Sequence, residues 1–430
     1  MERRTFLMAG AAGGALAMRA FGANDKVNVA VVGIGGRGKE HVKQYLQLPG
    51  ARVAALCDVD TAQTERGSQM VVDAGGAKPK VYQDLRKLYE DKDIDAVSIA
   101  TPNHWHALAT IWACQAGKDV YCEKPASYNI FEGQQMLNAA RKYNRMVQIG
   151  MQSRSTAHKR QAIQLVHDGA IGKVYMARGI CFKRRPSIGR TPVEPVPTGL
   201  NWDIFLGPAP MVPYTRNRFH YNWHWFWDTG NGDIGNQGIH EMDIARWGLN
   251  REVPKGVVST GGKYVYDDDQ ETPNTQLASF DYGDAELVFE VRGLPTGTED
   301  DIHMGGINSV GNTFFGDKGY LSVDHKGYQI FLGDKHTPGP SGLAEKGDTG
   351  PHMQNFLEAV KSRHIEGLHG DVAEGVASVY LVHMANISYR LGRKLELEDA
   401  TTLSFKNDAQ ANAMKTRPEY RKPYVVPTLG

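Results

Sequence analysis

Short apolar runs alternate with helical stretches over the first third of the chain. Residues 27–32 form a near-continuous apolar run, which is typical of a strand buried on both faces of a parallel sheet. Further strands are predicted at 52–57, 94–100, 119–122 and 146–149. Helical segments fill the intervals, including one that ends at Leu48 and one at 131–143. This alternation predicts a right-handed, doubly wound parallel sheet over residues 26–150.

From residue 152 onward the pattern changes, because most strands follow one another without helices between them. A helix at 159–167 leads into a long strand at 173–183, and an irregular region continues to about residue 229. Later strands are predicted at 256–266, 275–280, 285–292, 312–315, 320–324 and 328–332. The pattern indicates a second, α+β domain over residues 151–400 with an open, mostly antiparallel sheet.

Two helical patterns are expected to close this second domain. The first carries Met353, Phe356 and Val360 at helical spacing, and the second runs to a predicted C-cap at Gly392. Residues 401–430 are polar with scattered prolines. We expect them to form an arm, either on the surface or on a neighbouring subunit of a homo-oligomer.

The glycine-rich turn after the first strand gives the first chemical signal. Gly33, Gly35 and Gly38 are spaced as in turns that hold a nucleotide pyrophosphate at a helix N-terminus. Asp58 ends the second strand, where a carboxylate accepts hydrogen bonds from ribose hydroxyls and repels a 2′-phosphate. Asp60 adds negative charge and no arginine follows directly, so the pattern favours NAD over NADP. The expected contacts are Gly33, Ile34, Gly35, Gly36, Arg37, Gly38 and Asp58.

Two further strand ends are expected to meet the nicotinamide end of this cofactor. Residues 101–106 follow the fourth strand at the edge where ligands bind, although each histidine there equally fits a local structural hydrogen bond. Residues 123–125, Glu-Lys-Pro, follow the fifth strand, and a cis Lys–Pro bond would fix the direction of Lys124. Its ammonium group would polarise a substrate hydroxyl or carbonyl. The expected cofactor contacts are Thr101, Pro102, Asn103, His106, Glu123 and Lys124.

A second polar cluster lies in the later domain. On one continuous helix, Asn236 and His240 would share a face and Asp243 would follow one turn later. Oxidation of a hydroxyl needs a base, and histidine suits that role at neutral pH, although a buried structural histidine is the alternative. The expected catalytic residues are Lys124, His240, Asn236 and Asp243. His104 and His106 have no third ligand nearby, so no metal site is expected.

Residues 220–228 contain seven aromatic or histidine side chains. Such rings either stack on the apolar faces of sugars or pack in a core, and the pattern favours both equally. The basic stretch 183–186, with Arg190, either binds an anionic sugar or forms salt bridges between the domains. The expected substrate contacts are Lys124, Arg185, Tyr221, Trp223, Trp225, Asn236 and His240.

Composition narrows the class of protein. The 430 residues are 41% hydrophobic and 23% charged, with a formal net charge of +1, which is ordinary for a globular protein and gives no support to nucleic-acid binding. The sequence contains no run of 18 apolar residues, which is about the length needed to span a membrane. We expect no disulfide among Cys57, Cys114, Cys122 and Cys181.

The first 23 residues are expected to be a targeting segment rather than part of the fold. Arg3 and Arg4 are followed by Phe-Leu and a weakly apolar, Ala/Gly-rich run, which predicts a twin-arginine export signal; a general secretory signal or a basic leader is the alternative. That route carries folded proteins, and free NAD is scarce outside the cytoplasm. We therefore expect a periplasmic protein that keeps its NAD through turnover.

Together these motifs resemble the glucose–fructose oxidoreductase / inositol dehydrogenase (Gfo/Idh/MocA) family over nearly all of the chain from Lys26 onward. The resemblance implies a Rossmann domain plus an open α/β domain, with a sugar bound between Lys124 and His240. In the family the residue four before the histidine is usually Asp, whereas this chain has Asn236, which does not titrate. Proton transfer is therefore left to His240 and Lys124.

Three functions follow from this resemblance. The first is NAD-dependent oxidation or reduction of a sugar or polyol at a CH–OH group. The second is a redox glycosidase or lyase that oxidises a sugar transiently and cleaves its glycosidic bond by elimination. The third is a sugar sensor without turnover, against which Lys124 and His240 argue.

Overall fold

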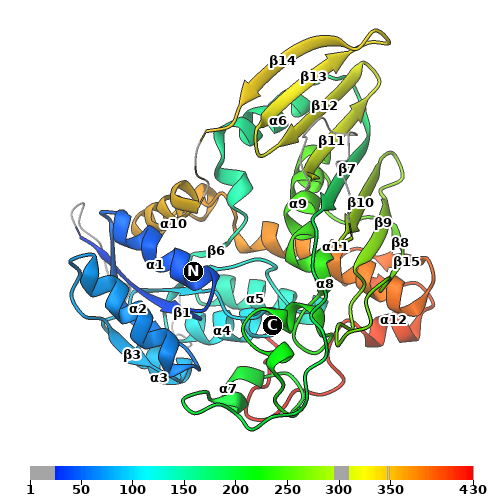
Figure 1. The fold of residues 1–430 in the computed structure, drawn as a ribbon. Coiled ribbons are helices and arrows are strands. Elements are labelled where there is room, and N and C mark those ends of the chain that lie inside the picture. The colour runs from blue at the N-terminus through cyan, green and yellow to red at the C-terminus, as the bar shows by residue number, and fades with distance from the viewer. Residues whose placement is uncertain (1–24, 295–308, 346, 348, 430) are drawn as a thin grey trace, which may run out of the picture.

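Two β-sheets lie side by side with helices around them (Figure 1). The computed structural model describes residues 25–294, 309–345, 347 and 349–429. The expected leader at 1–23 lies outside these described residues.

The first sheet has six strands in the order β3-β2-β1-β4-β5-β6, and every neighbouring pair is parallel. Its strands are β1 (Val27–Val32), β2 (Ala51–Cys57), β3 (Lys80–Tyr82), β4 (Ala96–Ile99), β5 (Asp119–Cys122) and β6 (Val147–Ile149). Its helices are α1 (Arg37–Gln47), α2 (Thr61–Asp73), α3 (Leu85–Tyr89), α4 (Asn103–Gln115) and α5 (Ile130–Lys142). The strand order reverses between β1 and β4, so a crevice opens there at the carboxyl ends of the strands.

The second sheet has ten strands in the order β14-β13-β12-β11-β7-β10-β9-β8-β15-β16. Only β7 and β10 among the named strands of this sheet run parallel, so the predicted mostly antiparallel sheet is confirmed. Its strands are β7 (Val174–Phe182), β8 (Gly256–Gly262), β9 (Thr275–Asp281), β10 (Glu286–Arg292), β11 (Ser309–Gly316), β12 (Gly319–Asp324), β13 (Gly327–Leu332), β14 (Thr337–Leu343), β15 (Leu395–Asp399) and β16 (Ser404–Phe405). β8 ends before the predicted residue 266. The backbone N–H of Tyr264 donates to the Asn274 side chain instead of to a neighbouring strand.

Helices cover one face of this sheet and join it to the first. Here α9 lies against β7 and β11, α11 against β8, and α6 against β12 and β13. The helices of this half are α6 (Ala157–His167), α7 (Trp202–Leu206), α8 (Gly232–Asn236), α9 (Gly238–Leu249), α11 (Val372–Leu391) and α12 (Ala409–Ala413). Short 3₁₀ turns occur at Gln152–Ser155, Arg216–Arg218, Asn222–Trp225 and Ile365–Gly367. Because α11 also packs on α5, it connects the two halves.

The helix with Met353 and Phe356 does not close the second domain, so that expectation was wrong. This helix, α10 (Thr349–Ser362), lies over α1 in Figure 1. Its apolar side chains share one core with Val27 and Val29 of the first sheet. An apolar helix face shows that the helix is buried, but the amino-acid pattern does not say which sheet buries it.

The segment at 401–430 lies on this chain's own surface, which is one of the two expected placements. After α12 it runs back toward α4 and α7, as the red end of the ribbon shows in Figure 1. Tyr424 is buried against Trp105, with ring centroids 5.5 Å apart, and its hydroxyl donates to Asp203. Near the end, the backbone N–H of Leu429 donates to Gln135 on α5.

Candidate functional site

The glycine turn between β1 and α1 forms an open cradle. Gly33 has φ +81°, and a Cβ on Gly38 would lie 1.7 Å from the Gly33 carbonyl oxygen, so both positions need glycine. A Cβ on Gly35 or Gly36 would meet nothing within 4 Å, which leaves space in front of the turn. Because α1 begins without a side-chain cap, its first N–H groups point toward that space. The turn therefore fits an anionic pyrophosphate.

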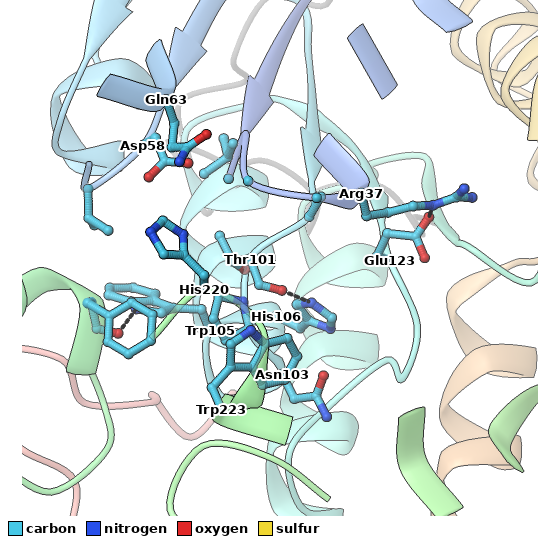
Figure 2. Close-up of a pocket in the computed structure, with 18 of the residues that line it drawn as sticks. Arg37, Asp58, Gln63, Thr101, Asn103, Trp105, His106, Glu123, His220 and Trp223 are labelled. Atoms are coloured by element: carbon cyan, nitrogen blue, oxygen red, sulfur yellow. Dashed lines mark hydrogen bonds and ion pairs between the residues drawn. The ribbon is translucent and has the colours of Figure 1, made fainter. Parts of the chain in front are cut away.

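A cavity of about 290 Å³ extends from this turn along the carboxyl ends of the first sheet (Figure 2). We call it the nucleotide cavity. Figure 2 shows Asp58 and Gln63 at one end and the pair formed by Arg37 and Glu123 at the other. The buried hydroxyl of Thr101 has no hydrogen-bond partner in the described residues, so it remains available to a ligand.

Asp58 lies at the end of β2, where a ribose is expected. Its carboxylate accepts the backbone N–H groups of Ile34 at 2.5 Å and Asp60 at 2.9 Å. Burial raises the pKa of Asp58 to about 6, although these two hydrogen bonds lower it. Of the expected contacts in the turn, Gly33, Gly35, Gly36 and Arg37 line the cavity, whereas Ile34 and Gly38 support it from behind.

The segment after β4 lines the same cavity and is tied to its surroundings. Asn103 donates to the side chain of Asn231 at 3.0 Å. The ring nitrogens of His106 lie 2.7 Å from the Pro125 carbonyl oxygen and 2.8 Å from that of Thr101, so His106 joins the turn after β4 to the turn after β5. Thr101, Pro102, Asn103 and His106 all line the nucleotide cavity as expected.

Glu123 and Lys124 lie at the inner end of that cavity. Glu123 is buried and accepts hydrogen bonds from Arg37 at 2.8 Å and Gln152 at 2.9 Å, and it lies 3.0 Å from a ring nitrogen of His41. Burial alone would raise the pKa of Glu123, but the Arg37 charge and the His41 contact hold it well below its usual range. This fixed negative charge anchors the turn that carries Lys124.

Lys124 reaches the junction of two cavities. The Lys124–Pro125 peptide bond is cis, as the sequence suggested. The Nζ atom donates to the carbonyl oxygen of Asn236 at 2.5 Å. Burial lowers the pKa of Lys124, although the nearby Glu123 carboxylate partly opposes this. Lys124, Arg37 and Glu123 line the nucleotide cavity and also a second cavity beside it.

This second cavity, of about 450 Å³, contains the expected histidine, and we call it the substrate cavity. His240 lines it together with Lys124. Burial, followed by the positive charge of Lys124, lowers the pKa of His240 to about 3. The imidazole is therefore neutral at physiological pH, so one of its ring nitrogens can accept a hydrogen bond from a substrate hydroxyl.

Asn236 and His240 do not share one helix face, so that expectation was wrong. α8 ends at Asn236, and α9 begins at Gly238, which lies so close to Phe289 that a Cβ would be 2.3 Å from the ring. Asn236 consequently lines the nucleotide cavity, whereas His240 lines the substrate cavity. The carbonyl oxygen of Asn236, rather than its side chain, holds Lys124.

Asp243 lines neither cavity, and the structure gives it a supporting role in place of the expected catalytic one. It is buried and accepts hydrogen bonds from the Arg154 guanidinium at 2.8–3.1 Å and from Ser378 at 2.7 Å. Burial alone would raise the pKa of Asp243, but Arg154 lowers it. This buried pair fixes α9, which carries His240, against the 3₁₀ turn after β6.

The aromatic residues of the segment 220–228 divide between the two alternatives that the sequence left open, ligand binding and core packing. Tyr221 and Trp223 line the nucleotide cavity, and Trp223 stacks on His224 with ring centroids 3.6 Å apart. Trp225 is buried and lines neither cavity, so it belongs to the core. Arg185 also lines neither, because its guanidinium pairs with Asp233 at 2.7 Å and lies over the Trp225 ring.

Several lining residues were missed because their types give no motif. Gln63 and Gln83 line the nucleotide cavity, although neither stands in a recognisable pattern. Lining residues missed in the substrate cavity include Gln152, Lys159, Glu241 and Asn312. They come from a 3₁₀ turn, α6, α9 and β11, which only the folded chain brings together.

Three other features bear on the chemistry. Cys57, Cys114, Cys122 and Cys181 are free and buried. In the described part of the chain, no three or more His, Cys, Asp or Glu residues are grouped so as to hold a metal ion. Over the same part of the chain, the helices are too short or too polar to cross a membrane.

Comparison with family models now decides the family. Residues 27–151 match the model described as "Oxidoreductase family, NAD-binding Rossmann fold", and residues 161–269 and 321–426 match the C-terminal alpha/beta domain of the same oxidoreductase family. The chain belongs to the Gfo/Idh/MocA family. Its first domain matches the NAD-binding model of that oxidoreductase family, so the resemblance and the cofactor expected from the sequence are both confirmed.

Individual relatives match over part of their length. A "Glycosyl hydrolase family 109 protein" of Saccharopolyspora erythraea is 32% identical over 210 residues, 45% of this chain and 45% of that protein. An inositol 2-dehydrogenase of Salmonella paratyphi B is 32% identical over 155 residues, 36% of this chain and 45% of that protein. The chain thus matches about half the length of these curated relatives.

Solved structures share the fold over nearly the whole chain. An NAD binding oxidoreductase from Klebsiella pneumoniae has a TM-score of 0.67 at 20% identity and covers 87% of this chain and 100% of its own. Levoglucosan dehydrogenase in complex with NADH and levoglucosan has a TM-score of 0.65 at 17% identity, with the same coverage. At these identities the likeness establishes the two-sheet architecture.

Proposed function

We propose that this protein oxidises or reduces a carbohydrate at a CH–OH group with NAD. The observation that carries the proposal is the position of Lys124, whose side chain lines both the nucleotide cavity and the substrate cavity. A group at that junction is placed to touch the reacting oxygen beside the nicotinamide. Relatives named as inositol 2-dehydrogenase and levoglucosan dehydrogenase support a polyol or sugar substrate.

The two main residues take complementary roles. Bound NAD would supply the acceptor or donor of a hydride. Lys124, held by the Asn236 carbonyl oxygen, polarises the reacting oxygen of the substrate. His240, which is neutral, takes the hydroxyl proton during oxidation and returns it during reduction. Asn236 has no titratable group, so it helps to orient the lysine and the substrate rather than to transfer protons.

Redox-neutral cleavage of a glycoside is the second candidate. It is supported by the relatives named as glycosyl hydrolase family 109 proteins. Oxidation of a sugar hydroxyl makes the neighbouring C–H bond acidic. A base then removes that proton, the aglycone leaves, water adds to the resulting double bond, and reduction of the ketone would restore the hydroxyl with no net change in NAD.

One experiment separates the two candidates. Neutral and acidic sugars, polyols and aryl glycosides are added to the holo-protein while the near-ultraviolet absorbance of reduced nicotinamide is followed. Lasting absorbance with a sugar or polyol supports the dehydrogenase. Release of the aryl group with no lasting absorbance supports glycoside cleavage. A holo-protein that does neither with the whole panel contradicts both.

Replacing Lys124 tests the catalytic centre itself. Lys124→Met should lower kcat/KM by about 10²–10⁴-fold, because a charge that stabilises the transition state is lost. The matched control is Lys173→Met, since Lys173 is exposed and lines neither cavity. Near-normal turnover by Lys124→Met would remove the proposed mechanism.

We further propose that the protein is exported with NAD already bound. The paired arginines Arg3 and Arg4 before a weakly apolar run support the twin-arginine route. NAD bound with a micromolar dissociation constant would dissociate in about a second. An exported enzyme that keeps its NAD therefore needs a dissociation constant of about 1 nM. Periplasmic protein should therefore contain NAD after purification. Replacing both arginines by lysine should keep the protein in the cytoplasm, and unchanged export or cofactor-free periplasmic protein would refute the proposal.

A further inference from the structure

Positive charge is concentrated in the substrate cavity. Lys124, Lys159, Lys183 and Arg37 all line it. Lys183 immediately follows β7, and its backbone N–H donates to the Arg292 carbonyl oxygen, which fixes the residue at the cavity. Among the described residues, no carboxylate lies within 4 Å of the Lys183 ammonium group.

The acidic residues of the same lining do not balance this charge. Glu123 is committed to Arg37, His41 and Gln152. Asp324 accepts the backbone N–H groups of the following turn at 2.7 and 3.0 Å. Burial raises the pKa of Glu241 to about 7, so much of this carboxyl is neutral at neutral pH. Among the described residues, the lining therefore has four basic side chains against three carboxyl groups, so basic groups are in excess.

The basic residues from Lys183 to Arg190 have two different roles. Arg185 pairs with Asp233, and Arg190 pairs with Asp267. These two arginines therefore act as salt-bridge partners within the second half of the chain. Lys183 instead lines the cavity that holds Lys124 and His240. The anionic-sugar alternative consequently rests on Lys183, which lines this cavity.

We propose that the substrate is an acidic carbohydrate whose anionic group is bound by Lys183 while its reacting hydroxyl meets Lys124 and His240. This inference rests on the proposed function, because it names the substrate class of the same site. A carboxylate and a phosphate share the required negative charge. Lysine ammonium groups bind either one as point charges.

Matched substrates test the inference on the holo-protein. Glucose is compared with glucuronate, galactose with galacturonate, and glucose 6-phosphate serves as the phosphate arm. The acidic member of a pair should show a kcat/KM at least about tenfold higher, mostly through a lower KM. Added salt should raise KM for the acidic member alone. Preference for the uronates or for the phosphate identifies which anion Lys183 binds.

Substitution of Lys183 gives the second readout. Lys183→Met should raise KM for the preferred acidic sugar by about 10–100-fold and leave neutral sugars nearly unchanged, whereas Lys183→Arg should restore much of the loss. The control is Lys335→Met, which removes the same charge from the exposed turn between β13 and β14. A merely structural role for Lys183 would change kcat/KM for neutral and acidic sugars alike.

The outcomes distinguish this inference from the proposed function. If neutral sugars reduce the nicotinamide as well as acidic ones do, the inference falls and the proposed function stands. An equal effect of Lys183→Met on both classes also overturns the inference. If no carbohydrate reacts at all, the proposed function fails and the inference fails with it.

Discussion

Asp58 determines how cofactor binding should depend on pH. Its pKa is about 6 because burial opposes its charge, and ribose hydroxyls donate more strongly to the ionised carboxylate than to the protonated carboxyl group. NAD binding thus favours loss of the proton, and affinity is lost as the pH falls through 6. Between pH 7.5 and pH 5 we expect the Kd for NAD to rise about tenfold, measured by NADH fluorescence titration.

The matched variant for this prediction is Asp58→Asn. The amide keeps the shape of the side chain but does not titrate over this range. We expect weaker binding at pH 7.5 and an almost flat pH profile down to pH 5. A steep profile that persists in Asp58→Asn would show that another group controls the pH dependence.

Asp243 should matter for stability before it matters for catalysis. Asp243→Ala leaves the buried Arg154 guanidinium with only the partly exposed Glu374 as a carboxylate partner among the described residues. We expect a loss of about 3 kcal/mol in the free energy of unfolding, measured by urea denaturation at pH 7. The exposed pair formed by Arg251 and Asp284 supplies the control, since Asp284→Ala should leave stability nearly unchanged. Unchanged stability in Asp243→Ala would contradict this role.

Among single residues, the sequence predicted correctly those whose type and position in a motif both indicate a role. Gly38 follows from the spacing of the glycine turn, and Asp58 and Lys124 follow from their places at strand ends. Asp243 and Arg185 look equally chemical in sequence, but their partners Arg154 and Asp233 are distant along the chain. A charged residue in the sequence indicates that a partner of opposite charge is needed. Whether that partner is a protein side chain or a ligand depends on the fold.

The turn between β1 and α1 gives the sharpest test at the scale of an element. In Gly38→Ala the new Cβ would lie 1.7 Å from the Gly33 carbonyl oxygen, so backbone must move. We expect a loss of about 3 kcal/mol or more in stability, with NAD binding abolished. Gly36→Ala is the control, because its Cβ meets no atom within 4 Å and the variant should fold normally. Equal thermal unfolding of the two variants would contradict this description of the turn.

Helices and strands were predicted correctly where one pattern of apolar positions extended over enough residues. β1, α5 and α11 each show such a pattern, and each lies close to its predicted position. The break between α8 and α9 did not follow, because the residues on both sides suit a single helix. The break falls just before Gly238, which packs closely against Phe289, a residue far away in sequence. The placement of α10 failed for the same reason.

At the scale of the whole molecule, the site exists only where the two halves meet. The first sheet supplies the nucleotide cavity and Lys124, whereas α9 supplies His240. α11 packs on both halves, and the C-terminal segment returns to the first half after leaving the second. The position of Lys124 relative to His240 is therefore fixed by the hydrogen bond from Lys124 to the Asn236 carbonyl oxygen and by contacts that lie farther away.

The C-terminal segment provides the final test of this arrangement. Tyr424 packs on Trp105, and Trp105 lines the nucleotide cavity, so the segment supports the cofactor site from behind. Tyr424→Ala removes this ring and its hydrogen bond to Asp203, and should cost about 3–5 kcal/mol while weakening NAD binding. The adjacent Val425 is 42% exposed, so Val425→Ala should change stability by less than about 0.5 kcal/mol. Thermal unfolding and NADH titration of both variants measure the two effects. If Tyr424→Ala behaves like Val425→Ala, the segment is a passive tail and the site does not depend on it.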